Sequence, residues 1–203
     1  MKIIYVPLNV PNILSLYRLY SFPFVLIIAI LGHQDLFAFF ICFNLITDVL
    51  DGWIARHFNQ ITEIGEKIDG LADNGTYLLA FTGIFIFKWS NFQPFAISFF
   101  IFLGLFLTSR LFFLVKFGKL HGFHAYSGKI GGYIHGSFFI VLFVFGFYEW
   151  FYYIMIISGY IISIENLLII YFLKECRTHV KGLYWLLRER RLHENIKTKE
   201  AIR

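Results

Sequence analysis

Apolar residues gather in six long runs separated by short polar segments, and this pattern dominates the chain. A helix that crosses a membrane needs about 20 consecutive apolar residues. The pattern therefore predicts an all-α membrane protein with six transmembrane helices in one bundle within residues 1–174, followed by a tail at residues 175–203. The predicted spans cover residues 13–31, 36–58, 68–89, 94–115, 130–148 and 151–173.

The beginning of the chain is less uniformly apolar than the rest. Here the apolar positions are mixed with Asn12, Ser15 and Arg18, and Pro11 is a residue type favoured in the first turn of a helix. Such a mixture is typical of a helix that lies in the membrane interface. We therefore expect a short N-terminal interfacial helix.

The composition supports a membrane protein and excludes other classes. Hydrophobic residues make up 58% of the chain and charged residues 15%, whereas a soluble chain carries about 25% charged residues. The two cysteines, Cys42 and Cys176, stand in an apolar run and in the tail, so no disulfide framework is predicted. Pro7 and Pro11 interrupt the first apolar stretch, which argues against a signal peptide.

The net charge of +5 belongs to the tail, because residues 174–203 hold nine Lys and Arg against four Glu. Such a tail is expected to lie beside anionic lipid headgroups, and no soluble basic fold indicates a nucleic-acid partner. By the positive-inside rule, the side with more Lys and Arg is cytoplasmic, so both termini are predicted there. That side carries Lys2, Arg56, Lys67, Lys116, Lys119, Lys129 and the tail, whereas the opposite loops carry only Lys88.

Acidic residues occur where an apolar span would normally exclude them. Asp48 and Asp51 share one face of the second predicted span, and Asp69 and Asp73 share one face of the third. A short turn joins these two spans, so their acidic faces can meet near the cytoplasmic end. Charges inside a membrane are costly and usually functional, and four converging carboxylates need protons, cationic partners or bound cations.

Oxygen ligands favour hard ions such as Mg²⁺, Mn²⁺ or Ca²⁺, and a pair of such ions is common in displacement at phosphorus. Gly52 and Ala55 leave space beside the acids for a flat ring or a phosphate, to which Arg56 offers a planar cation. Each feature alone also fits interfacial charge or small-residue helix packing. Their combination favours a site on both helices.

Read in order, the motif is Asp48-x2-Asp51-Gly52-x2-Ala55-Arg56-x8-Gly65-x3-Asp69-x3-Asp73. It resembles, at every position, the signature of the CDP-alcohol phosphatidyltransferases. The predicted spans and the chain length are also similar to that family. The resemblance therefore extends over nearly the whole chain.

The resemblance implies a membrane enzyme, usually a homodimer, that transfers a phosphatidyl group from CDP-diacylglycerol to an alcohol and releases CMP. It implies that Asp48, Asp51 and Asp69 bind two divalent ions, Mg²⁺ or Mn²⁺. Asp73 would complete the metal shell or act as the general base. The active site would open to the cytoplasm.

The same resemblance assigns the donor nucleotide to the small residues and the arginine of the motif. Gly52 and Ala55 would line the cytidine site. Arg56 would hold the pyrophosphate, and Gly65 would allow the donor to approach closely.

The acceptor is less well defined by the sequence. Arg110 lies in an apolar stretch and needs an anion, either a substrate phosphate or Glu165. Ser127 and Lys129 stand where the fifth predicted span begins, a position suited to phosphate, although Ser127 could equally be a helix N-cap. These cations suggest a phosphorylated acceptor. For Lys116 the ordinary positive-inside bias is the preferred explanation.

Residues 11–18 resemble the opening of phosphatidylglycerophosphate synthases, in which case Arg18 could reach a phosphate; snorkelling to the interface is the alternative. The match to that subfamily around Gly128 and Lys129 is partial. The expected acceptor is therefore glycerol 3-phosphate, followed by inositol phosphate, phosphatidylglycerol and an unphosphorylated alcohol.

Two features outside the motif have structural interpretations. His135 is expected to be an interior histidine rather than a metal ligand, and Gly128, Gly131, Gly132 and Gly136 suggest helix packing. A small cation transporter is the rival function, because intramembrane acids can form an ion path. The chain shows neither the internal repeats nor the broken mid-membrane helices typical of transporters.

Overall fold

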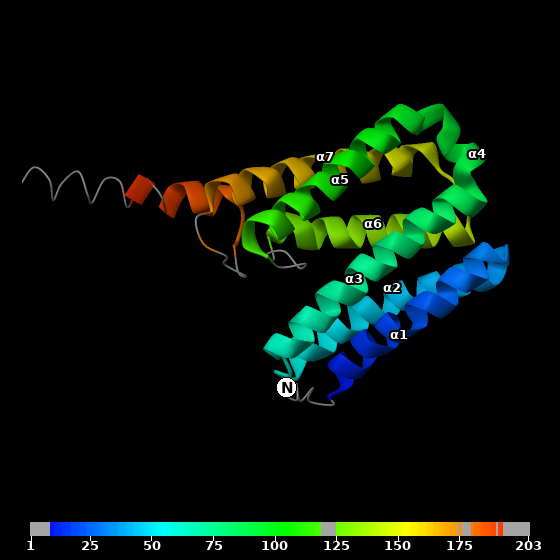
Figure 1. The fold of residues 1–203 in the computed structure, drawn as a ribbon, viewed down its shortest axis with the longest axis horizontal. Helices are drawn as coiled ribbons and strands as arrows, with labels where there is room; N and C mark the ends of the chain where they lie inside the picture. The colour runs from blue at the N-terminus through cyan, green and yellow to red at the C-terminus, as the bar shows by residue number, and fades with distance from the viewer. Residues whose placement is uncertain (1–8, 119–124, 174, 176–179, 190, 193–203) are drawn as a thin grey trace, which may run out of the picture. The chain divides into compact units, whose positions relative to one another are not determined.

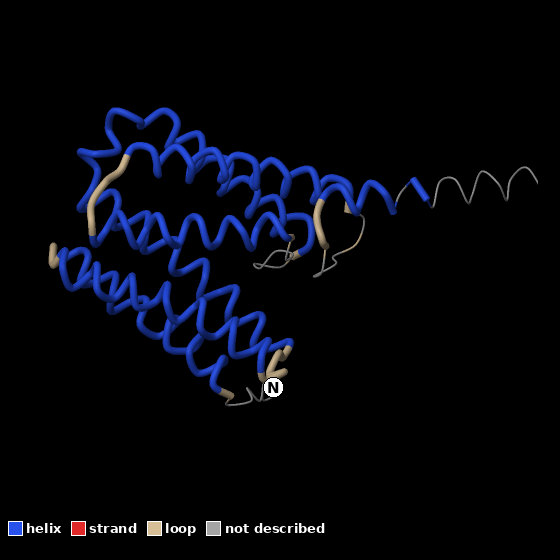
Figure 2. The backbone as a smooth tube through the Cα atoms, turned by 180° about the vertical axis from the view of Figure 1, so that it is seen from behind, coloured by secondary structure: helices blue, strands red, loops and turns tan. Residues whose placement is uncertain are grey.

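The computed structural model describes residues 9–118, 125–173, 175, 180–189 and 191–192. Within these residues all regular structure is helical (Figure 2). The chain divides into two compact units. One consists of Met1–Ala96 and Gly136–Glu149, and the other of Ile97–His135 and Trp150–Arg203.

A long helix corresponds to each of the six predicted spans. The helices are α1 (Val10–Ile30), α2 (Gln34–His57), α3 (Glu63–Gly83), α5 (Ala96–Phe117), α6 (Tyr126–Val144) and α7 (Glu149–Phe172). Between α3 and α5 the helical path changes in the π-helical η1 (Ile84–Lys88), the short α4 (Trp89–Phe92) and the 3₁₀ turn η2 (Gln93–Phe95).

Five stretches among the described residues are long and apolar enough to cross a membrane. The number is five because α3 to α5 form one helical run of 54 residues, Ile64–Phe117. At about 1.5 Å per residue, this run is far longer than the hydrocarbon core of about 30 Å, so it does not fit a single straight crossing.

Helix α1 begins as the sequence predicts and continues without a break. The side chain of Asn9 caps it by accepting a hydrogen bond from the backbone N–H of Asn12 at 3.1 Å, and Pro11 lies in the first turn. The residues around Ser15 therefore belong to the same helix as the apolar part, and no separate short helix precedes it in the described residues. Gly32 has a φ of +79°, which suits glycine in the tight turn to α2.

In the first unit, α1 packs against both α2 and α3, and α2 also contacts α3 (Figure 1). The second part of α6 contributes aromatic contacts: Phe139 meets Tyr77 and Phe81 edge to face. Gly83 permits close packing, because a Cβ atom there would overlap the ring of Phe37. These contacts fix α2 and α3, the two helices that carry the acidic motif.

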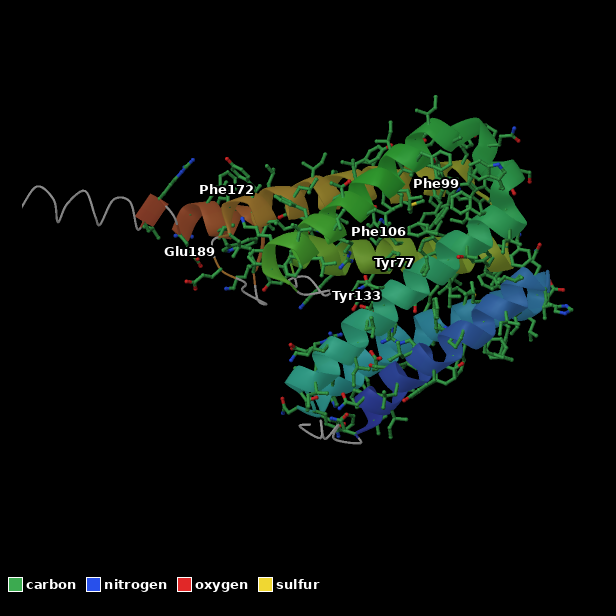
Figure 3. All side chains as sticks on the ribbon, viewed as in Figure 1. Tyr77, Phe99, Phe106, Tyr133, Phe172 and Glu189 are labelled. Carbon is green, nitrogen blue, oxygen red and sulfur yellow. The ribbon has the colours of Figure 1, made fainter. Side chains whose placement is uncertain are left out.

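In the second unit, α5 packs on α7 and on the first part of α6. Phe99 and Phe106 both project from α5 (Figure 3). The hydroxyl of Tyr160 donates to the carbonyl of Ser98 at 2.7 Å. A Cβ atom on Gly131 would overlap Ile162, which confirms a packing role for this glycine, whereas Gly132 has nothing within 4 Å.

Part of the tail folds onto the second unit. The carbonyl of Lys181 accepts from the N–H of Tyr126 at 3.1 Å, and Glu165 accepts from the N–H of Leu183 at 3.0 Å. A short helix over residues 183–189 follows, and Leu186 packs into a small hydrophobic cluster. The other buried members of this cluster are Ala125, Ile169, Leu173 and Val180.

Candidate active site

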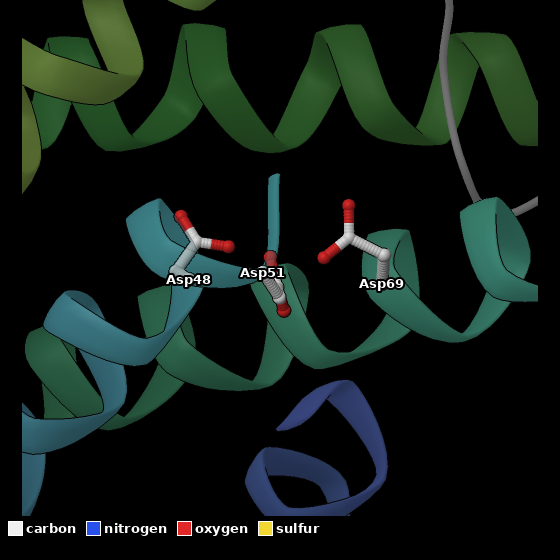
Figure 4. A group of neighbouring side chains, drawn as sticks. All are labelled: Asp48, Asp51 and Asp69. Carbon is white, nitrogen blue, oxygen red and sulfur yellow. The ribbon is translucent and has the colours of Figure 1, made fainter. Parts of the chain in front are cut away.

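The four aspartates of the motif converge on one place in the first unit. Asp48 and Asp51 project from α2, and Asp69 and Asp73 project from α3. Figure 4 shows Asp51 between Asp48 and Asp69. One carboxylate oxygen from each of these three residues lies within 4.8 Å of the other two, so the group could hold a metal ion.

The guanidinium of Arg18, from α1, lies among the four carboxylates. Its Nη1 is 2.5 Å from Asp48 Oδ1 and 2.8 Å from Asp73 Oδ1. Its Nη2 is 2.7 Å from Asp51 Oδ2 and 2.6 Å from Asp69 Oδ1. The sequence predicts that Arg18 reaches a substrate phosphate or the interface, and the structure brings it to the acidic motif.

Two further polar residues of α1 lie on the same buried face as Arg18. Ser15 Oγ donates to Asp51 Oδ2 at 3.0 Å, and Asn12 and Ser15 are each 3% exposed. The sequence predicts both residues at a membrane interface, whereas in the structure Ser15 binds an acid of the motif. Their spacing of three residues was the available signal, because it puts them on one helix face.

The cluster has a buried side and an accessible side. The side chains of Arg18 and Asp51 are 0% and 4% exposed, whereas Asp48, Asp69 and Asp73 range from 35% to 42%. One guanidinium can balance only one of the four carboxylates, so the fully ionised cluster would carry three unbalanced negative charges. This all-oxygen, strongly negative group fits a hard divalent cation.

The residues assigned to the donor nucleotide lie next to the aspartates on the same helices. A Cβ atom on Gly52 would come within 3.3 Å of Arg56 Nη1, so the absence of a side chain makes room for that guanidinium. Ala55 is half-buried and Arg56 is exposed. Gly65 lies against other side chains of the protein. A Cβ atom there would overlap Asn12 Oδ1 and lie 2.7 Å from Thr62 Oγ1.

The remaining acceptor candidates belong to the second unit. Ser127 lies inside the first turn of α6, which begins at Tyr126, so it is not the N-cap. Its Oγ is buried without a hydrogen-bond partner among the described residues, and Lys129 is exposed. Arg110 lies over the ring of Phe106 at 5.2 Å and forms no ion pair with any described residue, Glu165 included.

Two other polar residues of this unit have structural partners. Lys116 donates to the carbonyl of Ile170 at 2.7 Å, near the C-terminal end of α7. His135 is 5% exposed, with Nε2 3.4 Å from Ser158 Oγ, as expected for an interior histidine. Lys119 lies outside the described residues.

The fold and the site together define a helical, multi-pass membrane protein with an acidic motif on two adjacent helices that could hold a metal ion. The sequence model of the CDP-alcohol phosphatidyltransferase family matches residues 8–170. The chain therefore belongs to this family of membrane enzymes.

Curated relatives carry a more specific name. A protein of Aquifex aeolicus named CDP-diacylglycerol–glycerol-3-phosphate 3-phosphatidyltransferase is 32% identical over 111 residues, which is 54% of this chain and 61% of the relative. Proteins of the same name from Salmonella choleraesuis and Escherichia coli are 35% and 34% identical over 68 residues, 32% of this chain and 37% of each relative. The matches thus span less than two thirds of the relatives' length. No solved structure matches the chain.

Proposed function

We propose that this protein transfers the phosphatidyl group of CDP-diacylglycerol to glycerol 3-phosphate, forming phosphatidylglycerophosphate and releasing CMP. The observation that carries the proposal is the convergence of the four motif aspartates of α2 and α3 on one accessible cluster. The names of the curated relatives support the choice of donor and acceptor.

Two divalent ions, Mg²⁺ or Mn²⁺, are the proposed cofactors. Asp48, Asp51 and Asp69 would bind them, since their oxygens already lie within 4.8 Å of one another. Asp73 would complete the shell. When bound, such ions neutralise the donor pyrophosphate and the charge that develops at phosphorus.

The chain's own residues would orient the substrates and handle the proton. Arg56, which lies close to Gly52, would bind the donor pyrophosphate through its planar guanidinium, and Ala55 would lie beside the cytidine. The acceptor hydroxyl then attacks the phosphorus that bears diacylglycerol, and the bond from that phosphorus to CMP breaks. Asp73, 42% exposed, would take the hydroxyl proton.

Ser127, Lys129 and Arg110 are the proposed contacts of the acceptor phosphate, because two of them are cations and the sequence pattern suits an anion. Ser127 and Lys129 lie in the first turn of α6, at the positive end of the helix dipole, which favours an anion. The buried Oγ of Ser127, which has no partner among the described residues, is an additional donor. Arg110, with no ion pair to a described residue, is the third candidate. Arg18 is now better assigned to the aspartates than to the acceptor.

The remaining topology follows from charge and helix length. We infer six spans, because a run of 54 helical residues fits two crossings and not one. The excess of Lys and Arg supports a cytoplasmic location for both termini and the active site. The family resemblance favours a homodimer. The pattern of apolar and polar residues favours a catalytic domain at residues 1–174 and an interfacial segment near the N-terminus.

The test is CMP release by the purified full chain in detergent with CDP-diacylglycerol and Mg²⁺ or Mn²⁺. Glycerol 3-phosphate, inositol 1-phosphate, phosphatidylglycerol and glycerol are supplied separately. Metal-dependent release with glycerol 3-phosphate alone is the expected result. CMP release with a different acceptor would support the proposed type of reaction but assign another acceptor. No CMP release by folded protein with any of these acceptors would contradict the proposal.

A further inference from the structure

Arg18 uses all four hydrogens of its terminal nitrogens on the aspartates. Each of Nη1 and Nη2 carries two hydrogens and lies within 2.8 Å of two carboxylates. The remaining donor, Nε, is buried and has no partner among the described residues. Arg18 therefore has little capacity left to bind a substrate phosphate.

The contacts come from the buried side of the cluster. The Arg18 side chain is 0% exposed, whereas Asp48, Asp69 and Asp73 are each more than one third exposed. The contacts of Arg18 with Asp48 and with Asp73 are each made through the Oδ1 atom of the carboxylate. A cation would approach the cluster from this accessible side, opposite the buried guanidinium.

We propose that Arg18 is a positioning residue that holds the four carboxylates together before a metal ion binds. This inference rests on the proposed metal site, because it concerns how that site is assembled. A single guanidinium joins α1, α2 and α3 at one point and reduces the repulsion among four like charges. Groups that orient metal ligands in this way commonly change metal affinity by 10- to 100-fold when removed.

The opposite possibility is that Arg18 competes with the metal for the carboxylates. The two possibilities predict opposite changes in metal affinity when Arg18 is removed. If Arg18 positions the ligands, its removal weakens metal binding even though the cluster becomes more negative. If Arg18 competes with the metal, removal strengthens metal binding, because a positive charge has left the site.

The experiment measures Mn²⁺ binding by the loss of the free-ion electron paramagnetic resonance signal, on purified full chain in detergent. We expect Arg18→Gln to raise the Mn²⁺ dissociation constant about 10- to 100-fold. Arg110→Gln is the matched control, because it removes another helical arginine that has no ion pair with a described residue. Equal or tighter Mn²⁺ binding by Arg18→Gln would overturn the proposal.

A second measurement separates positioning from simple packing. In EDTA, Arg18→Gln is expected to unfold at a lower temperature than the wild type. The double variant Arg18→Gln/Asp51→Asn should recover part of that loss, because Asp51 is the most buried of the four carboxylates and its charge is then removed. Loss of packing alone would not be corrected by neutralising a carboxylate, so no recovery would contradict the proposal.

Arg18→Lys keeps the experiment informative if Arg18→Gln does not fold. Lysine retains the charge but has one nitrogen with three hydrogens, so it cannot bind four carboxylates separately. Weaker Mn²⁺ binding supports the proposal, and unchanged binding overturns it. If the wild type itself shows no saturable Mn²⁺ binding, the metal site of the proposed function fails, whereas the recovery in EDTA still tests the role of Arg18.

Discussion

A Cβ atom on Gly65 would overlap the side-chain oxygen of Asn12, so the beginning of α3 and the first turn of α1 meet closely at this glycine. Asn12 also donates to Thr62 at 3.4 Å, and Thr62 in turn caps α3 by accepting from the Gly65 N–H at 3.0 Å. The glycine of the motif therefore has a structural role in addition to any role toward the donor. It sets how closely α1, which carries Arg18, approaches α3.

Gly65→Ala is expected to destabilise the protein by about 1–3 kcal/mol, the usual cost of overpacking a close contact. Gly132→Ala is the matched control, because nothing lies within 4 Å of a Cβ there and alanine favours helix by about 1 kcal/mol. Thermal unfolding in detergent measures both. Equal stability of Gly65→Ala and Gly132→Ala would show that the contact of Asn12 with Gly65 is unimportant. Adding Asn12→Ala to Gly65→Ala should recover part of the lost stability, because the overlapping oxygen is then removed.

Asp69→Asn is expected to reduce metal-dependent CMP release by more than about 100-fold, because it removes a charged metal ligand from the cluster. Asp35→Asn is the control, because Asp35 is an exposed aspartate in the first turn of α2 and lies outside the cluster. Turnover is measured at several Mg²⁺ concentrations. Full turnover by folded Asp69→Asn would remove this residue from the metal site.

The helices could be predicted from the sequence because apolar runs near 20 residues have few alternatives to membrane helices. The predicted start of the third span was late, at residue 68, whereas α3 begins at Glu63. The first turns of this helix carry charged residues that hydropathy does not detect, and the capping hydroxyl of Thr62 marks its beginning instead. Hydropathy thus locates the apolar part of a helix rather than its ends.

The acidic site was also visible in the sequence, because the four aspartates lie within 26 residues and on two neighbouring helices. The role of Arg18 could not be predicted from the sequence. A polar face on an apolar helix looks the same in sequence whether it lies at the interface or is buried against other helices. The carboxylates that bind Arg18 are at least 30 residues away in the chain, so only the packing of α1 on α2 and α3 reveals the pairing.

Lys129→Ala tests the assignment of the acceptor phosphate to the beginning of α6. We expect the KM for glycerol 3-phosphate to rise about tenfold, equivalent to about 1.4 kcal/mol for one charge-assisted contact. The KM for CDP-diacylglycerol should be unchanged. Lys88→Ala is the control, because Lys88 lies in η1, away from α6 in the sequence. An equal rise for both substrates in Lys129→Ala would indicate a general disturbance rather than acceptor binding.

The final prediction concerns the tail, which the sequence suggested to be a solvated end and which is held in part by Glu165. Glu165→Ala removes the acceptor for the Leu183 N–H, so this amide should exchange with solvent faster, and residues 183–189 should become more sensitive to protease. Glu165→Gln keeps a side-chain oxygen at the same position and is expected to retain most of the protection, since a neutral amide oxygen still accepts the hydrogen bond. Hydrogen exchange at Leu183, followed by mass spectrometry, distinguishes the variants. If Glu165→Ala exchanges no faster than the wild type, the segment is held by the burial of Leu186 and its neighbours instead.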